Sequence, residues 1–164
     1  MSIYNLFKFK KPKEKKRFIS IVIFREPGGM MATCRNKYGK EEFFFPLNIE
    51  IHPKTDPLEM AQGLVADSMS SVIDGKKAKF EVKKNEFLEV VRLHSEEIFE
   101  TVYALKLHDE RFDGLVGKRE KVTRILPSAI INKSRGHFVW LFPLALSSYG
   151  ATWNVPDIHF NMPV

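Results

Sequence analysis

Hydrophobic and polar residues are distributed along this chain in runs that predict several strands around one amphipathic helix. Residues 18–24 are β-branched and aromatic with almost no polar break, which predicts a buried strand. Pro27-Gly28-Gly29 is a strong turn signal, and a short strand predicted at residues 30–35 would complete a hairpin. A second turn at residues 36–39 then leads into a strand that begins at residues 42–45.

The strongest helix signal covers residues 57–73. Asp56 is a good N-cap, Pro57 suits the first helical position, and Glu59 can complete a capping box. Gly75 stands where a C-terminal cap is expected. The apolar positions that share one helical face are Leu58, Ala61, Val65, Met69 and Val72.

The second half of the chain is predicted to be richer in strand. The strands expected here cover residues 80–82, 87–93, 98–107 and 121–126. Residues 87–93 and 98–107 should pair across the short link Ser95-Glu96-Glu97, and the period of two in residues 98–107 supports a sheet with one buried face. We expect a loop at residues 112–117 and helices at 128–132 and 138–147.

The composition is that of one globular α+β domain. Hydrophobic residues make up 44% of the 164 residues and charged residues 28%, and 14 Phe side chains need a core. The longest apolar run, residues 138–146, is too short to span a bilayer. Lysines interrupt the N-terminus early, as they would not in a secretory signal, and Cys34 has no disulfide partner. These features predict a cytoplasmic protein.

The positive charge of the chain is concentrated at its start. Residues 1–17, here called the head, carry seven basic side chains and one acidic one, which equals the net charge of +6 of the whole chain. Residues 18–164 hold 19 basic and 19 acidic side chains and are formally neutral. The predicted nucleic-acid-binding residues are Tyr4, Phe7, Lys8, Phe9, Lys10, Lys11, Lys13, Lys15, Lys16 and Arg17.

The head combines cations with aromatic rings, and this pattern suits more than one partner. Lysines neutralise phosphates, and Tyr4, Phe7 and Phe9 could stack on unpaired bases, so RNA or single-stranded nucleic acid is the favoured partner. An anionic membrane surface would also attract these residues, and it ranks below nucleic acid. The head could instead solubilise the chain or dock on another subunit.

The sequence shows no pattern typical of a catalytic, metal or cofactor site. The five His residues lack ligand spacing, and His108-Asp109-Glu110 falls where a strand is expected to end. No nucleophile elbow surrounds the serines near the helix, and there is no phosphate-binding glycine loop. We therefore expect no catalytic residues, no metal and no cofactor.

The order of the predicted elements over residues 18–148 resembles the Nudix family. The resemblance rests on Phe45-Pro46-Leu47, which leads through residues 56–61 into a helix that opens with Glu59-Met60-Ala61. Family members typically have a strand ending in Pro-Gly-Gly and a helix that opens in Glu-x-Ala and continues Arg-Glu-apolar-x-Glu-Glu. The resemblance implies a mixed β-sheet flanked by helices over residues 18–150, with residues 151–164 as a C-terminal tail.

The same resemblance argues against the family's activity. Nudix hydrolases cleave nucleoside diphosphate linkages with divalent metals held by clustered glutamates of that helix, and such hard cations need oxygen ligands. Alignment on Ala61 places Gly63 and Leu64 at the Arg-Glu pair, and Asp67 and Ser68 at the Glu-Glu pair. Only one carboxylate remains, so we expect a non-catalytic domain that binds RNA.

Two alternatives stay open at this point. One is a divergent Nudix hydrolase that takes its carboxylates from Glu96, Glu97 or Glu120. The other is a structural subunit of a ribonucleoprotein or viral assembly, in which the head would thread into a partner.

Overall fold

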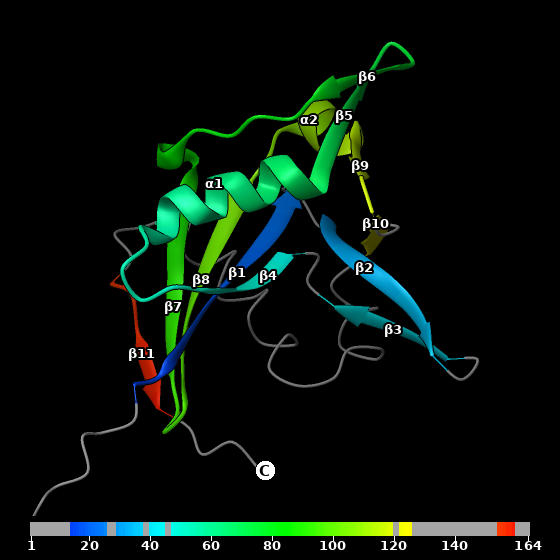
Figure 1. The fold of residues 1–164 in the computed structure, drawn as a ribbon. Coiled ribbons are helices and arrows are strands. Elements are labelled where there is room, and N and C mark those ends of the chain that lie inside the picture. Colours follow the sequence, from blue (N-terminus) through cyan, green and yellow to red (C-terminus); the bar gives the residue numbers. More distant parts are fainter. Residues whose placement is uncertain are drawn as a thin grey trace, which may run out of the picture.

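A computed structural model describes residues 14–25, 29–37, 40–44, 47–119, 122–125 and 154–159 (Figure 1). Its strands are β1 (Lys16–Arg25), β2 (Gly29–Lys37), β3 (Lys40–Phe44), β4 (Leu47–Ile51), β5 (Met69–Ile73), β6 (Lys76–Lys79), β7 (Phe87–His94), β8 (Ile98–Lys106), β9 (Leu115–Gly117), β10 (Val122–Ile125) and β11 (Asp157–His159). Its helices are α1 (Pro57–Ser68), the 3-10 turn η2 (Lys84–Glu86) and α2 (Asp109–Asp113).

The described strands form one large mixed sheet and one small sheet. The large sheet has eight strands in the order β10-β2-β1-β8-β7-β11, with β3 paired to β2 and β4 paired to β1. β1 lies at its centre, parallel to β8 and antiparallel to β2 and β4. The small sheet has the order β6-β5-β9. This arrangement confirms the predicted α+β class with a mixed sheet.

The central strand β1 is buried on both faces, as its unbroken apolar sequence predicts. Ile19, Ile21 and Ile23 pack into the core cluster, while Val22 and Phe24 on the opposite face are equally inaccessible. The predicted start at residue 18 was wrong by two residues. Lys16 and Arg17 already pair with Ile98 and Phe99 of β8, so the strand takes in the last two residues of the predicted head.

Helix α1 begins where the sequence predicts it. The Oδ1 atom of Asp56 accepts a hydrogen bond from the Leu58 amide, at 3.1 Å, and Pro57 occupies the first helical turn. Helix α1 lies on one face of the large sheet (Figure 1), and its residues Ala61 and Val65 are fully buried in the core cluster. Burial of a side chain the size of Val65 contributes about 1.5–3 kcal/mol, so this apolar face fastens the helix to the sheet.

The predicted end of the helix was wrong. α1 stops at Ser68, and Met69–Ile73 is strand β5, which pairs with β6 on one side and β9 on the other. Pairing on both sides satisfies the backbone of β5 and overrides the helical spacing of its apolar residues. Gly75 therefore lies in the β5–β6 turn and is not a helix cap.

The predicted pairing of the second half is largely confirmed. β7 and β8 form an antiparallel hairpin, and β10 forms within the predicted strand at residues 121–126. The strand predicted at residues 80–82 lies instead at Lys76–Lys79, as β6. Phe80 and Val82 follow it outside a strand, and both are buried in the core. The predicted loop at 112–117 contains the end of α2 and strand β9.

The end of the chain departs from the predicted tail. Residues 157–159 form β11, which pairs in parallel with β7, so part of residues 151–164 belongs to the large sheet. The helices predicted at 128–132 and 138–147 lie outside the described residues. No helix in the described parts of the chain is long and apolar enough to cross a membrane.

Candidate functional site

A groove of about 1000 Å³ runs along one side of α1 and faces the segment that links β6 to η2. Glu59, Gln62, Gly63 and Ala66 form the helix wall of this groove. A side chain at Gly63 would meet nothing within 4 Å, so the groove is open above the middle of the helix.

Two contacts join the opposite walls of the groove. The Nε2 atom of Gln62 donates a hydrogen bond to the carbonyl oxygen of Val82, at 2.8 Å. At the start of α1, Lys84 Nζ lies 3.3 Å from Asp56 Oδ2. The hydrogen bond from Lys84 and then that from the Leu58 amide hold the pKa of Asp56 below its ordinary value. These links fix the segment before η2 relative to the helix.

The charges that line the groove are balanced in number. The lining has three acidic and three basic side chains: Glu59, Glu81, Glu86, Lys79, Lys83 and Arg111. Two of the pairs are in contact: Lys79 Nζ lies 3.0 Å from Glu81 Oε1, and Arg111 Nη1 lies 2.5 Å from Glu86 Oε1. A balanced and largely paired lining gives no strong local attraction for a phosphate or for a divalent cation.

The carboxylates of α1 do not form a cluster. The helix has two acidic residues, Glu59 and Asp67, both exposed. They lie eight positions apart, which corresponds to about 12 Å along a helix axis. Across all the described residues, no group of three or more His, Cys, Asp or Glu side chains lies close enough to hold a metal ion. Helix α1 therefore lacks the charge density that a divalent metal site needs.

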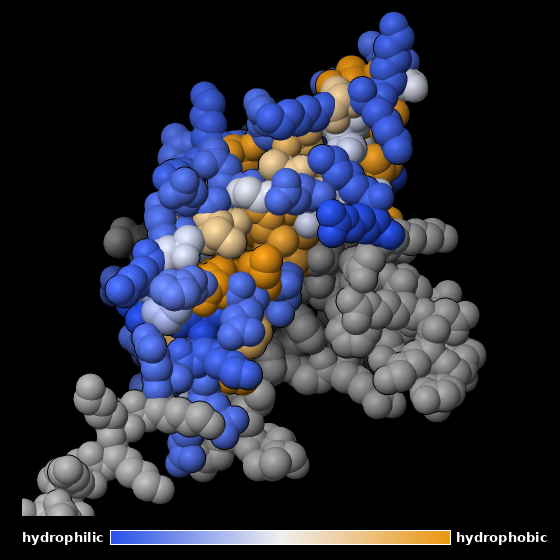
Figure 2. All heavy atoms as spheres, viewed as in Figure 1, coloured by the Kyte–Doolittle hydropathy of each residue, from blue (hydrophilic) through white to orange (hydrophobic). Residues whose placement is uncertain are grey.

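Of the aligned positions of the Nudix resemblance, only that of Asp67 carries a carboxylate. Leu64 is half-buried and packs against the core cluster, as do Met60 and, on β4, Ile49. Figure 2 shows apolar surface between α1 and β4. Ser68 is half-buried at the end of the helix, where its carbonyl accepts a hydrogen bond from the Lys118 amide. This side of α1 is apolar.

The glutamates suggested as substitutes do not approach α1. Glu96 and Glu97 lie in the exposed turn between β7 and β8, at the far end of the sheet from α1 (Figure 1). Glu120 lies outside the described residues. The structure therefore does not bring Glu96 or Glu97 to this helix.

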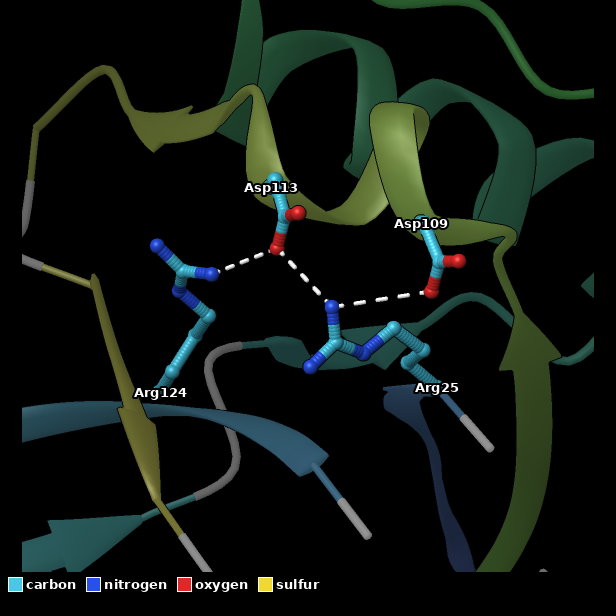
Figure 3. A network of polar contacts seen from close by, with 4 residues as sticks. All are labelled: Arg25, Asp109, Asp113 and Arg124. Carbon is cyan, nitrogen blue, oxygen red and sulfur yellow. Dashed lines mark hydrogen bonds and ion pairs between the residues drawn. The ribbon is translucent and has the colours of Figure 1, made fainter. Parts of the chain in front are cut away.

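The short helix α2 connects the groove to the end of the central strand. On one side Arg111 bonds to Glu86 and to the Glu81 carbonyl, and its guanidinium lies 5.4 Å from the centre of the Phe80 ring. On the other side Asp113 accepts hydrogen bonds from both Arg25 of β1 and Arg124 of β10, at 3.2 and 2.5 Å (Figure 3).

These contacts give α2 a structural role. In Figure 3 the Asp113 carboxylate lies between the two guanidinium groups, and Asp109 lies on the far side of Arg25, 3.6 Å from its Nη1 atom. Two arginines and two aspartates balance in charge. The network therefore holds β1, β10 and α2 together and presents no excess charge to a ligand.

The described part of the predicted head reaches the sheet. Tyr4, Phe7, Phe9, Lys8, Lys10, Lys11 and Lys13 lie outside the described residues. Lys15, Lys16 and Arg17 are exposed, and the guanidinium of Arg17 lies 5.6 Å from the centre of the Phe99 ring. The Lys16 amide donates a hydrogen bond to the Glu97 carbonyl, at 2.9 Å. The head therefore leaves the domain at the β7–β8 end of the sheet.

Sequence reasoning missed the wall opposite α1. Its members come from β6, from the segment before η2, from η2 itself and from α2, and only the fold brings them together. The alternating charges of Lys79, Glu81 and Lys83 were a usable signal, because alternation places side chains on one side of an extended segment. Arg111 gave no signal in the sequence.

Comparison with known proteins identifies the fold. No protein-family model matches the sequence, and neither does any curated protein. Among solved structures, a MutT structure from work on Aliivibrio salmonicida and Vibrio cholerae matches with a TM-score of 0.59 and 9% identity, over 82% of this chain and 99% of that one. A Nudix hydrolase from Nitrosomonas europaea matches with a TM-score of 0.55 and 12% identity, over 90% and 81% of the two chains.

A third match comes from a binding complex. A chain of the complex between the C-terminal domain of mouse MUTYH and human PCNA matches with a TM-score of 0.55 and 10% identity, over 82% of this chain and 90% of that one. At these identities the matches establish the fold alone. The chain has a Nudix-like fold.

Proposed function

We propose that this Nudix-like chain is a non-catalytic binding protein whose partner is RNA or single-stranded nucleic acid. The observation that carries the first half is the helix α1. Its two carboxylates are separated by about 12 Å along the axis, and Leu64, at a position where the family has a glutamate, packs against the core cluster. Among the described residues, α1 therefore does not supply the cluster of oxygen ligands that phosphate cleavage of the family's kind requires.

The second half of the proposal rests on charge. The head holds the whole net charge of +6, while residues 18–164 are neutral. Lys16 and Arg17 anchor the head to the sheet by β1 pairing, so the remaining cations are tethered at one end of the domain. A tethered run of lysines with interspersed aromatic rings matches the requirements of single-stranded nucleic acid: neutralised phosphates and stacked bases.

A hydrolase remains the second candidate, because of one feature of the groove. Glu59, Glu81 and Glu86 all line it, and two of the matched structures are named as MutT and a Nudix hydrolase. Lys79 and Arg111 engage two of these glutamates. Glu59 makes no ion pair with another described residue, so it is the residue on which this alternative depends.

The test is a nucleotide panel with Mg²⁺, together with the absorbance ratio of the purified protein before and after a high-salt wash. We expect no release of phosphate or nucleoside monophosphate, and a nucleic-acid absorbance that the wash removes. Turnover that disappears in both Glu59→Gln and Asp67→Asn would establish the hydrolase. Inactive protein that carries no nucleic acid and binds none would leave the assembly-subunit alternative.

A further inference from the structure

The β5–β6 hairpin projects from the domain beyond the end of α1 (Figure 1). Asp74 and Gly75 form its turn with φ angles of 51° and 75°. Two consecutive positive φ values are the geometry of the tight hairpin turn that matches strand twist, and it keeps the two strands paired to their ends. Ile73, immediately before the turn, is 60% exposed. The hairpin is thus an ordered projection.

The small sheet concentrates positive charge. Residues 69–79 and 115–119 carry five basic side chains, Lys76, Lys77, Lys79, Lys118 and Arg119, against Asp74 alone. All five basic residues are exposed. Because residues 18–164 sum to zero, this net charge of +4 leaves −4 on the rest of the domain. Basic side chains are therefore enriched in these two segments relative to the rest of residues 18–164.

The pairing register places Lys77 and Lys79 on one face of the hairpin and Lys76 on the other, because neighbouring residues of a strand point to opposite faces. Lys77 lies opposite Val72 and Lys79 opposite Ser70, while Val116 flanks Ser70 on the other side. Lysines two residues apart on a strand lie about 7 Å apart on the same face. Figure 2 shows hydrophilic surface at the tip of the projecting hairpin, with apolar surface beside it.

Not all of these cations have a local electrostatic partner. Lys79 pairs with Glu81, and Lys118 Nζ donates to the Ala66 carbonyl in the last turn of α1, at 2.8 Å. Lys76, Lys77 and Arg119 make no ion pair with any other residue that the structure describes. Their charges are therefore available to an external anion without breaking contacts inside the domain.

We propose that this cationic small sheet, led by Lys76 and Lys77 on the hairpin, is a second contact surface for the phosphate backbone of single-stranded nucleic acid. This inference rests on the proposed function, because it takes the same partner. The head leaves the domain at the β7–β8 end of the sheet, whereas the small sheet lies at the opposite end (Figure 1). A single-stranded nucleic acid bound at both places would run along the domain.

Nucleic acid fits this surface better than a membrane does. A lone exposed Ile73 would contribute only about 1.5–3 kcal/mol on insertion, which is too little to hold a domain on a bilayer. A polyanion needs no apolar anchor, since contacts between lysines and phosphates release counterions. Lysines on an edge strand can also serve only to prevent strand pairing between molecules, and in that role their removal would leave oligonucleotide binding unchanged.

The experiment compares two full-length double variants that lose the same charge. Lys76→Gln/Lys77→Gln changes the hairpin, and Lys54→Gln/Lys83→Gln changes two exposed lysines elsewhere that also lack an ion pair among the described residues. Both are titrated with a fluorescent single-stranded oligoribonucleotide and with phosphatidylserine vesicles at several salt concentrations. Because two fewer phosphates are neutralised, the hairpin variant should show a salt slope shallower by about 1.4, whereas the control should match the intact chain.

Each outcome decides the question. Equal oligonucleotide binding by the two variants overturns the inference while leaving the proposed function standing, and so does a loss confined to the vesicles. An intact chain that binds no oligonucleotide overturns both. If the hairpin variant loses oligonucleotide binding and a chain lacking residues 1–13 keeps it, the hairpin is supported as the contact surface and the head is rejected.

Discussion

Arg111 of α2 donates a hydrogen bond to Glu86 of η2 across the wall of the groove, with 2.5 Å between Nη1 and Oε1. Burial acts to raise the pKa of Glu86, but the hydrogen bonds from Arg111 and from the Lys83 amide outweigh it and lower that pKa. The stabilisation from this lowered pKa is fully present above the ordinary value of 4.5 and is lost as pH falls through the folded value.

Arg111→Ala should lower the free energy of unfolding by about 1–3 kcal/mol, because it removes hydrogen bonds to Glu86 and the Glu81 carbonyl and the contact with Phe80. Urea denaturation at pH 7 measures the loss. The loss should shrink as pH falls through the folded-state pKa of Glu86, which lies below 4.5, because protonation removes the charge that Arg111 contacts. Arg119→Ala, at an exposed position without a described ion pair, is the control and should change stability by less than about 0.5 kcal/mol. An equal effect of the two substitutions would show that Arg111 does not fasten the groove wall.

Val65→Asp should lower the free energy of unfolding by several kcal/mol. Val65 is fully buried on the face of α1 that packs on the sheet, and a carboxylate there would have no partner. Gly63→Asp places the same group on the exposed side of the same helix and serves as the matched control. Thermal or urea unfolding distinguishes them. A tolerated Val65→Asp would mean that α1 does not pack on the sheet by this face.

Gly63→Ala should raise the free energy of unfolding by about 0.5–1 kcal/mol, because glycine inside a helix is less favourable than alanine. Nothing lies within 4 Å of the added methyl group, so no clash offsets the gain. Urea denaturation provides the measurement. A destabilised Gly63→Ala would show that the groove is closed over the middle of α1.

The sequence predicted those elements that local chemistry determines. Asp56 and Pro57 specify the start of α1 by capping, and the apolar run of β1 specifies a strand buried on both faces. The end of α1 could not be predicted in the same way, because Met69 and Val72 continue its helical spacing. Only the pairing of β5 with β6 and β9 decides that this segment is extended.

The sequence predicted less of the groove beside α1 than of the fold. The single aligned carboxylate, Asp67, could be read directly from the sequence. The groove wall could not, because Arg111 reaches Glu86 only through the placement of α2 after β8. The head was recognised by its charge, but its boundary depended on the pairing of Arg17 with Phe99, which no local pattern signals.

Replacing Tyr4, Phe7 and Phe9 by Ala should weaken binding to single-stranded RNA by about 1–3 kcal/mol for each base that stacks on a ring. The slope of log K against log salt should not change, because stacking releases no counterions. Fluorescence anisotropy at several salt concentrations measures both quantities. Replacing the same residues by Leu tests whether an aromatic ring is needed or only an apolar group. Full binding by the Leu variant would exclude base stacking.

The salt dependence of RNA affinity, compared between the intact chain and a chain lacking residues 1–13, tests the central claim most directly. The deletion spares β1, which begins at Lys16, and removes Lys8, Lys10, Lys11 and Lys13. For the intact chain, engagement of four to seven cations predicts a slope of roughly −3 to −5, and the deletion should make it shallower by about 3. Affinity should fall by orders of magnitude. An unchanged slope and affinity in the shortened chain would contradict nucleic-acid binding by the head.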